Sequence, residues 1–162
     1  MNVHKLLHNV VPFINDSVNH IAFGGCGLFA MLLHNVLASK GIESHIVLVR
    51  GGCYDEASVT RFIDKTGGDC INSAILAAHN SNKHHYQLPN HHICVSVGDI
   101  LYDNNGRQDD DRAISDGIEP DMMEHALTWN VWNSSFNDSN KGVDTRATIN
   151  EQLLFALKGA TA

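Results

Sequence analysis

One apolar segment constrains the fold of this chain more than any other feature of its sequence. Residues 26–40 read CGLFAMLLHNVLASK, with Lys40 at the end and Gly41 directly after it, which is typical of a helix that stops there. The segment is apolar on nearly every side, so a helix formed by it would be buried all round. Such a helix needs other elements to cover it, and we expect it at the centre of the fold.

The other segments of the chain supply elements that can cover this helix. The spacing of apolar residues predicts strands over 44–50, 91–97 and 100–103, the last two joined by a tight hairpin at Gly98-Asp99. The order of elements is helices, then antiparallel strands, then helices, which predicts an α+β fold. A length of 162 residues predicts one domain over 1–162. Helices are predicted over 3–14, 55–65, 70–79, 109–116, 119–129 and 146–158, and a polar loop over 133–140.

Charge and hydropathy argue against two classes of partner. The formal net charge is −7 and no basic run occurs, whereas proteins that bind nucleic acids usually carry a basic patch. No apolar stretch approaches the roughly 20 residues of a membrane-spanning helix, and the N-terminal segment lacks the features of a signal peptide. We therefore expect a cytoplasmic protein with reduced cysteines and with neither a nucleic acid nor a membrane as partner.

Cys26 lies where the glycine turn Phe23-Gly24-Gly25 meets the start of the apolar helix. Free backbone N–H groups and the positive end of the helix dipole stabilise a thiolate at such a position. The thiolate is the nucleophilic form, and a free cysteine with a pKa of about 8.5 is mostly protonated at neutral pH. The glycines let a substrate carbonyl approach, with the Cys26 N–H as one donor of an oxyanion hole. Cys26 is therefore the candidate nucleophile.

The predicted hairpin supplies a candidate base for this nucleophile. With Gly98-Asp99 as the loop, the alternation of side chains places His92, Cys94 and Asp103 on one face of the sheet. His92 and Asp103 are then diagonal neighbours, about 5–8 Å apart and within reach of an imidazole–carboxylate hydrogen bond. We expect His92 to act as the base and Asp103 to orient it.

Two alternatives to this assignment stay open. A longer turn would invert the alternation of the hairpin and make His91 and Asn104 the pair. Cys70 also follows two glycines, with Asp69 as a candidate helix N-cap, and is a rival nucleophile.

The remaining cysteines and histidines carry weaker signals. Cys53 and Cys94 do not begin a helix, and we expect them to pack as buried thiols. The pairs His84-His85 and His91-His92 invite a metal-binding interpretation. Adjacent strand residues point to opposite faces, however, and no metal motif occurs. We expect neither a metal nor a cofactor.

Two blocks of the sequence resemble the transglutaminase-like cysteine hydrolases of the papain-like superfamily. In the first block, a cysteine opens a helix, a small residue follows four positions later (here Ala30), and a Gly-Ile pair leads into a strand (here Gly41-Ile42). In the second block, a histidine opens a strand and an aspartate closes the next, as in HICVSVGDILYD. The resemblance covers residues 26–51 and 92–103, in the order Cys, His, Asp.

This resemblance implies a papain-like fold whose central helix begins at the nucleophile and packs on a small antiparallel sheet. It implies a triad of Cys26, His92 and Asp103 that forms a thioester with an amide of a peptide or protein substrate. Water or an amine then resolves the thioester. Papain-like enzymes commonly place a Gln about six residues before the Cys as the second oxyanion donor, and Asn19 and His20 are the candidates here. A catalytically inactive binding module of the same fold and a His-rich metal-binding protein are the alternative functions.

Overall fold

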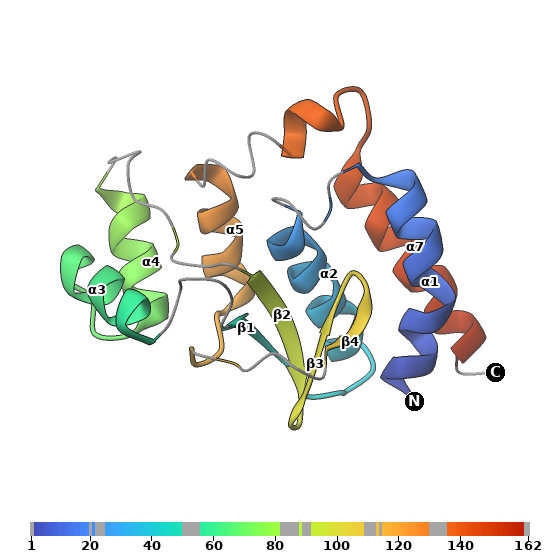
Figure 1. Ribbon diagram of the computed structural model, residues 1–162, viewed down its shortest axis with the longest axis horizontal. Helices are drawn as coiled ribbons and strands as arrows, with labels where there is room; N and C mark the ends of the chain where they lie inside the picture. Colours follow the sequence, from blue (N-terminus) through green and yellow to red (C-terminus); the bar gives the residue numbers. More distant parts are fainter. Residues whose placement is uncertain are drawn as a thin grey trace.

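Helices and one antiparallel sheet make up the part of this chain that the structure describes. The computed structural model describes residues 2–19, 21, 25–49, 56–81, 88, 92–108, 113, 115–129 and 136–160. Helices flank a small sheet, and the first and last helices lie side by side (Figure 1). The predicted α+β class is confirmed. The elements are α1 (Val3–Ser17), α2 (Cys26–Ala38), β1 (His45–Val49), α3 (Glu56–Thr66), α4 (Ile71–Asn80), β2 (His92–Val97), β3 (Ile100–Asp103), β4 (Gly106–Gln108), α5 (Pro120–Trp129) and α7 (Thr145–Ala160).

The sheet is antiparallel throughout, with strand order β1-β2-β3-β4. The pairs Val95–Tyr102 and Val97–Ile100 confirm the predicted hairpin register. Gly98 adopts φ 59° in its turn, a conformation that glycine tolerates well. Strand β4 is absent from the sequence prediction. It has three residues and no hydrophobic alternation, and it forms because Gly106 (φ 97°) turns the chain back along β3.

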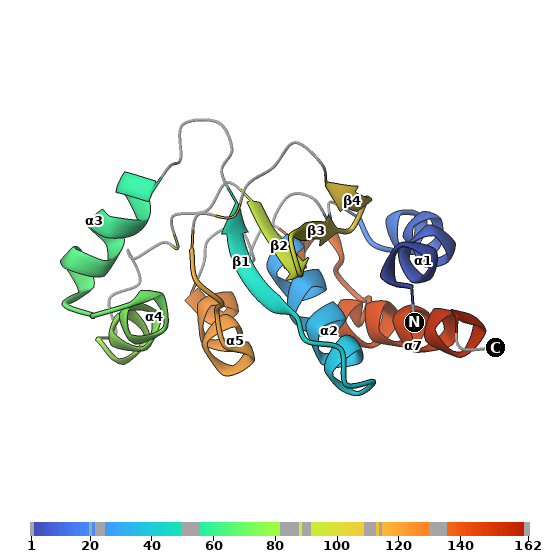
Figure 2. The same ribbon diagram turned by 90° about the horizontal axis from the view of Figure 1, so that it is seen from below.

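Helix α2 lies against one face of the sheet, with α5 on one side of it and α7 on the other (Figure 2). It meets side chains that point to this face, such as Leu48 and Val95, both fully buried. Phe29 and Leu33 are no more than 1% exposed. Each buried side chain of this size contributes about 1.5–3 kcal/mol. The central, mostly buried helix predicted from residues 26–40 is confirmed; it ends at Ala38, and Asn35 and Ala38 are exposed.

The predicted helix at 109–116 is wrong where the structure describes it. Ala113 forms an isolated bridge with Val49, and Ile118 forms another with Ile46. The Leu48 N–H also donates to the Ser115 hydroxyl at 2.9 Å. The outer edge of β1 requires hydrogen-bond partners, and satisfying it outweighs the local preference for a helix. Residues 109–112 and 114 lie outside the described part.

The predicted polar loop at 133–140 is also wrong in part, because residues 136–139 form a helical turn. Phe136 is fully buried and fixes this turn against the core. Residues 133–135 lie outside the described part. Within the described residues, no helix combines the length and the apolar character needed to cross a membrane.

Candidate active site

Cys26 is the first residue of α2 and is 5% exposed. Gly25 precedes it as the N-cap and has no side chain to occupy the N–H groups of the first turn. A Cβ at Gly25 would lie 2.7 Å from the Phe136 ring and 2.8 Å from the Ile21 carbonyl oxygen. Only glycine therefore fits this bend, which brings the chain into α2 with the Cys26 thiol at the positive end of the helix.

His92 and Asp103 form the contact predicted from the hairpin. The Nε2 atom of His92 lies 2.6 Å from Oδ2 of Asp103. The other carboxylate oxygen, Oδ1, accepts the Asn105 N–H at 2.7 Å and the Gln108 side-chain amide at 2.9 Å. Asp103 is 5% exposed, so these bonds fix a nearly dry carboxylate with Oδ2 against the imidazole. Gln108 was missed by sequence reasoning because β4 was missed.

The imidazole of His92 also connects to two thiols. Burial alone would lower the pKa of His92, but its hydrogen bonds with Asp103, Cys26 and Cys94, together with the charge of Cys94, raise it to about 12. His92 therefore keeps its proton at neutral pH. The structure pairs His92 with Asp103, and Cys26 is among the groups that act on the His92 imidazole.

Cys94 is buried as predicted, within a small apolar cluster on the sheet face opposite α2. The cluster also contains Val47, Val49 and Leu101. Cys94 has a chemical partner as well as a packing role, because it hydrogen-bonds His92. The signal for this contact was present in the sequence, since strand alternation places Cys94 on the same face as His92.

Of the two candidates for the second oxyanion donor, the structure describes Asn19. The Asn19 side-chain amide donates to the Ser139 carbonyl at 3.2 Å, and its backbone N–H donates to Asn140 at 2.8 Å. Asn19 thus ties the end of α1 to the turn at 136–140, and its amide donor is engaged there. His20 lies outside the described residues.

The structure describes only some of the residues of the alternative assignments. The Asn104 side chain donates to Asn15 of α1 at 3.1 Å, while the confirmed register supports His92 as the partner of Asp103. His91, His84, His85 and Cys53 lie outside the described residues.

Cys70 is exposed and precedes α4 as its N-cap. Its sulfur lies 3.5 Å from the Ser73 hydroxyl, and this hydrogen bond is the main cause that lowers the Cys70 pKa. The described contacts of the Cys70 thiol are with Ser73 and the Asn72 backbone, plus the repulsive charge of Asp69. Cys70 is therefore a thiol with lowered pKa whose described contacts include no histidine.

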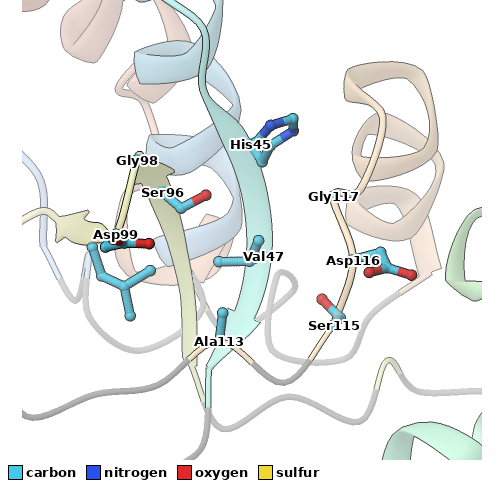
Figure 3. A pocket seen from close by; sticks show the side chains of 10 residues that line it. His45, Val47, Ser96, Gly98, Asp99, Ala113, Ser115, Asp116 and Gly117 are labelled. Atoms are coloured by element: carbon cyan, nitrogen blue, oxygen red, sulfur yellow. The ribbon is translucent and has the colours of Figure 1, made fainter.

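A pocket of about 490 Å³ lies on the sheet face opposite α2 (Figure 3). Its lining includes His45 and Val47 of β1, Ser96 of β2, and Ser115 and Asp116 of the segment beside β1. By alternation along β2, this is the face that carries the His92 side chain. None of the three candidate triad residues is among the described lining residues of this pocket.

Comparisons with known proteins add no family to this description. No protein-family model matches the chain, and searches of curated proteins and of solved structures found no significant match.

Proposed function

We propose that this protein is a cysteine-dependent hydrolase or acyltransferase of papain-like, transglutaminase-like fold, acting on an amide through a thioester at Cys26. One observation carries the proposal. The His92 ring lies 2.6 Å from the Asp103 carboxylate, and the thiol at the start of α2 is among the groups that raise the pKa of this ring. A nucleophile, a base and a group that orients the base, arranged in this order, are the elements of a catalytic triad.

The proposed first half-reaction begins from a proton that already resides on His92. The positive imidazolium and the N-terminal end of α2 both stabilise a thiolate at Cys26. The thiolate attacks the amide carbonyl carbon, and the Cys26 N–H stabilises the oxyanion that forms. His92 then donates its proton to the leaving nitrogen, the C–N bond breaks, and the thioester remains on Cys26.

In the second half-reaction, the neutral imidazole accepts a proton from the incoming nucleophile. Attack by water releases an acid and gives a protease, deamidase or amidase. Attack by an amine gives an acyltransferase. Asp103 keeps the ring oriented and balances its positive charge in both halves, supported by the bonds from Asn105 and Gln108. The proposed substrate is an amide in a peptide or protein, and the reduced thiol suits the cytoplasm.

A catalytically inactive binding module is the second candidate, and the position of Asn19 favours it. Its side-chain amide is engaged with Ser139, so it does not serve as a second oxyanion donor in this conformation. A protein without that donor would keep the cleft for recognition but would form no thioester at a useful rate.

Acyl transfer from nitrophenyl acetate separates the two candidates. The enzyme proposal predicts a burst of about one nitrophenolate per chain, followed by slow turnover, because an acyl-enzyme accumulates. Peptide mass spectrometry should locate the acetyl group on Cys26. The variant Cys26→Ser should lose the burst, and the matched variant Cys70→Ser should retain it. A burst that survives Cys26→Ser, or its absence from the wild type, would favour the binding module.

A further inference from the structure

Three potential metal ligands converge on the sheet face opposite α2. A ring nitrogen of His92, the sulfur of Cys94 and a carboxylate oxygen of Asp103 all lie within 4.8 Å of one another. His92 and Cys94 share this face of β2, and Asp103 projects from the end of β3. Strands hold these ligands more rigidly than a loop would, and a rigid frame suits a metal site.

The donor set of these residues matches zinc. Imidazole nitrogen, thiolate sulfur and carboxylate oxygen are the three ligand types that Zn²⁺ takes in proteins, and a mixed set with a thiolate disfavours Mg²⁺ and Ca²⁺. Zinc bonds of about 2.0–2.3 Å place tetrahedral ligand atoms roughly 3.3–3.8 Å apart. The His92–Asp103 contact of 2.6 Å would open and Cys94 would approach, each by about 1 Å, which side-chain rotation can supply.

The surroundings of Asp103 already resemble the outer shell of a metal site. Its Oδ1 accepts hydrogen bonds from the Asn105 N–H and the Gln108 amide, which leaves Oδ2 directed at the other two ligands. Partners of this kind fix the orientation of a ligating carboxylate and strengthen metal binding. The apolar cluster around Cys94 lowers the local dielectric, which strengthens attraction between the ligands and a cation.

The site also has a charge that suits a cation and a route for the ion. The Asp103 carboxylate lies 2.6 Å from the His92 ring and within 4.8 Å of the Cys94 sulfur, and a carboxylate at this position attracts a divalent ion. The His92 side chain is 18% exposed, whereas that of Asp103 is 6% exposed. An ion can therefore reach the site from the His92 side.

We propose that His92, Cys94 and Asp103 bind Zn²⁺, and that the bound ion switches off the reaction of Cys26. The inhibitory part rests on the proposed function, whereas the binding part does not. On binding, Zn–N and Zn–S bonds form, the imidazolium and thiol protons pass to solvent, and Asp103 exchanges a hydrogen bond for a metal bond. A zinc-bound imidazole is neutral: its remaining N–H is too weak an acid to protonate the leaving amine readily, and no ring lone pair is left to accept a proton.

Cobalt is the probe for the binding part, because Co²⁺ replaces Zn²⁺ and shows a charge-transfer band when a thiolate binds it. The full chain, purified without a His tag and treated with a chelator, should develop this band with about one equivalent of Co²⁺. The band should vanish in Cys94→Ala and persist in Cys70→Ala. Asp103→Asn should weaken binding at least about 10-fold while keeping the band at saturation. Absence of the band, or a band unchanged by Cys94→Ala, overturns the site.

The nitrophenyl acetate burst tests the inhibitory part. One equivalent of Zn²⁺ should slow the wild-type burst at least about 10-fold, but by less than about 2-fold in Cys94→Ala, each relative to its own metal-free rate. A cobalt band without slowing by Zn²⁺ overturns inhibition. A metal-free protein that shows no burst contradicts the proposed function and leaves the cobalt result standing, so the two failures are distinguishable.

Discussion

Replacing Asp103 with asparagine is expected to destabilise the fold more at pH 6.5 than at pH 8.5. Burial lowers the pKa of His92, but its interactions with other groups raise this pKa to about 12, and the hydrogen bond to Asp103 is the largest of them. A group whose folded pKa lies above its unfolded value of about 6.5 stabilises the fold fully below that unfolded value. This contribution declines as the pH rises toward the folded pKa.

The wild-type protein should therefore lose up to about 1.4 kcal/mol of this contribution per pH unit above neutrality. In Asp103→Asn the imidazole loses its charged partner, and most of this slope should disappear. Urea unfolding of metal-free protein at the two pH values measures the effect. The matched variant Asp99→Asn changes an exposed carboxylate in the β2–β3 turn and should cost less than about 0.5 kcal/mol at either pH. An Asp103→Asn cost that is equal at both pH values, or greater at pH 8.5, contradicts this account.

Replacing Phe136 with alanine is expected to lower the free energy of unfolding by about 3–5 kcal/mol. The ring is fully buried in the main core and lies against Gly25, directly before the nucleophile. Its loss leaves a cavity beside the bend that leads into α2. We expect the burst of acylation at Cys26 to slow as well, because the start of α2 loses its support.

The exposed Phe155 of α7 provides the matched control for this substitution. It is 77% exposed, so Phe155→Ala removes the same atoms from the surface and should change stability by less than about 0.5 kcal/mol. Urea unfolding of the two variants side by side checks the prediction. Similar small costs for both would show that the turn at 136–139 does not support the site.

The parts that the sequence predicted well are those with strong local patterns. Residues 26–40 are apolar on nearly every side, and a mostly buried central helix forms there. The hairpin at Gly98-Asp99 has a short turn, so side-chain alternation predicted both its register and the His92–Asp103 contact. In each case the local signal agreed with the tertiary structure.

The parts that were missed depend on contacts between distant segments. Ala113 and Ile118 lie beside β1 because the edge of this strand needs hydrogen-bond partners. The local sequence around these two residues does not indicate such a contact with a distant strand. Phe136 orders a turn because it reaches the core, although its neighbours in sequence are polar. Gln108 reaches Asp103 from β4, a strand too short to show alternation. The fold around Cys26 is therefore less visible in the sequence than the triad candidates themselves.

Alkylation of Cys26 by iodoacetamide at pH 6 tests the central claim most directly. The reagent reacts with the thiolate, and the proposed pairing of Cys26 with His92 predicts reaction at a pH where an ordinary thiol is almost entirely protonated. Peptide mass spectrometry resolves the rate at Cys26 from that at the exposed Cys70 in the same metal-free sample. We expect His92→Gln to lower the rate at Cys26 at least about 10-fold and to leave Cys70 within about 2-fold. A Cys26 rate unchanged by His92→Gln, or one that falls equally at both cysteines, would contradict the triad.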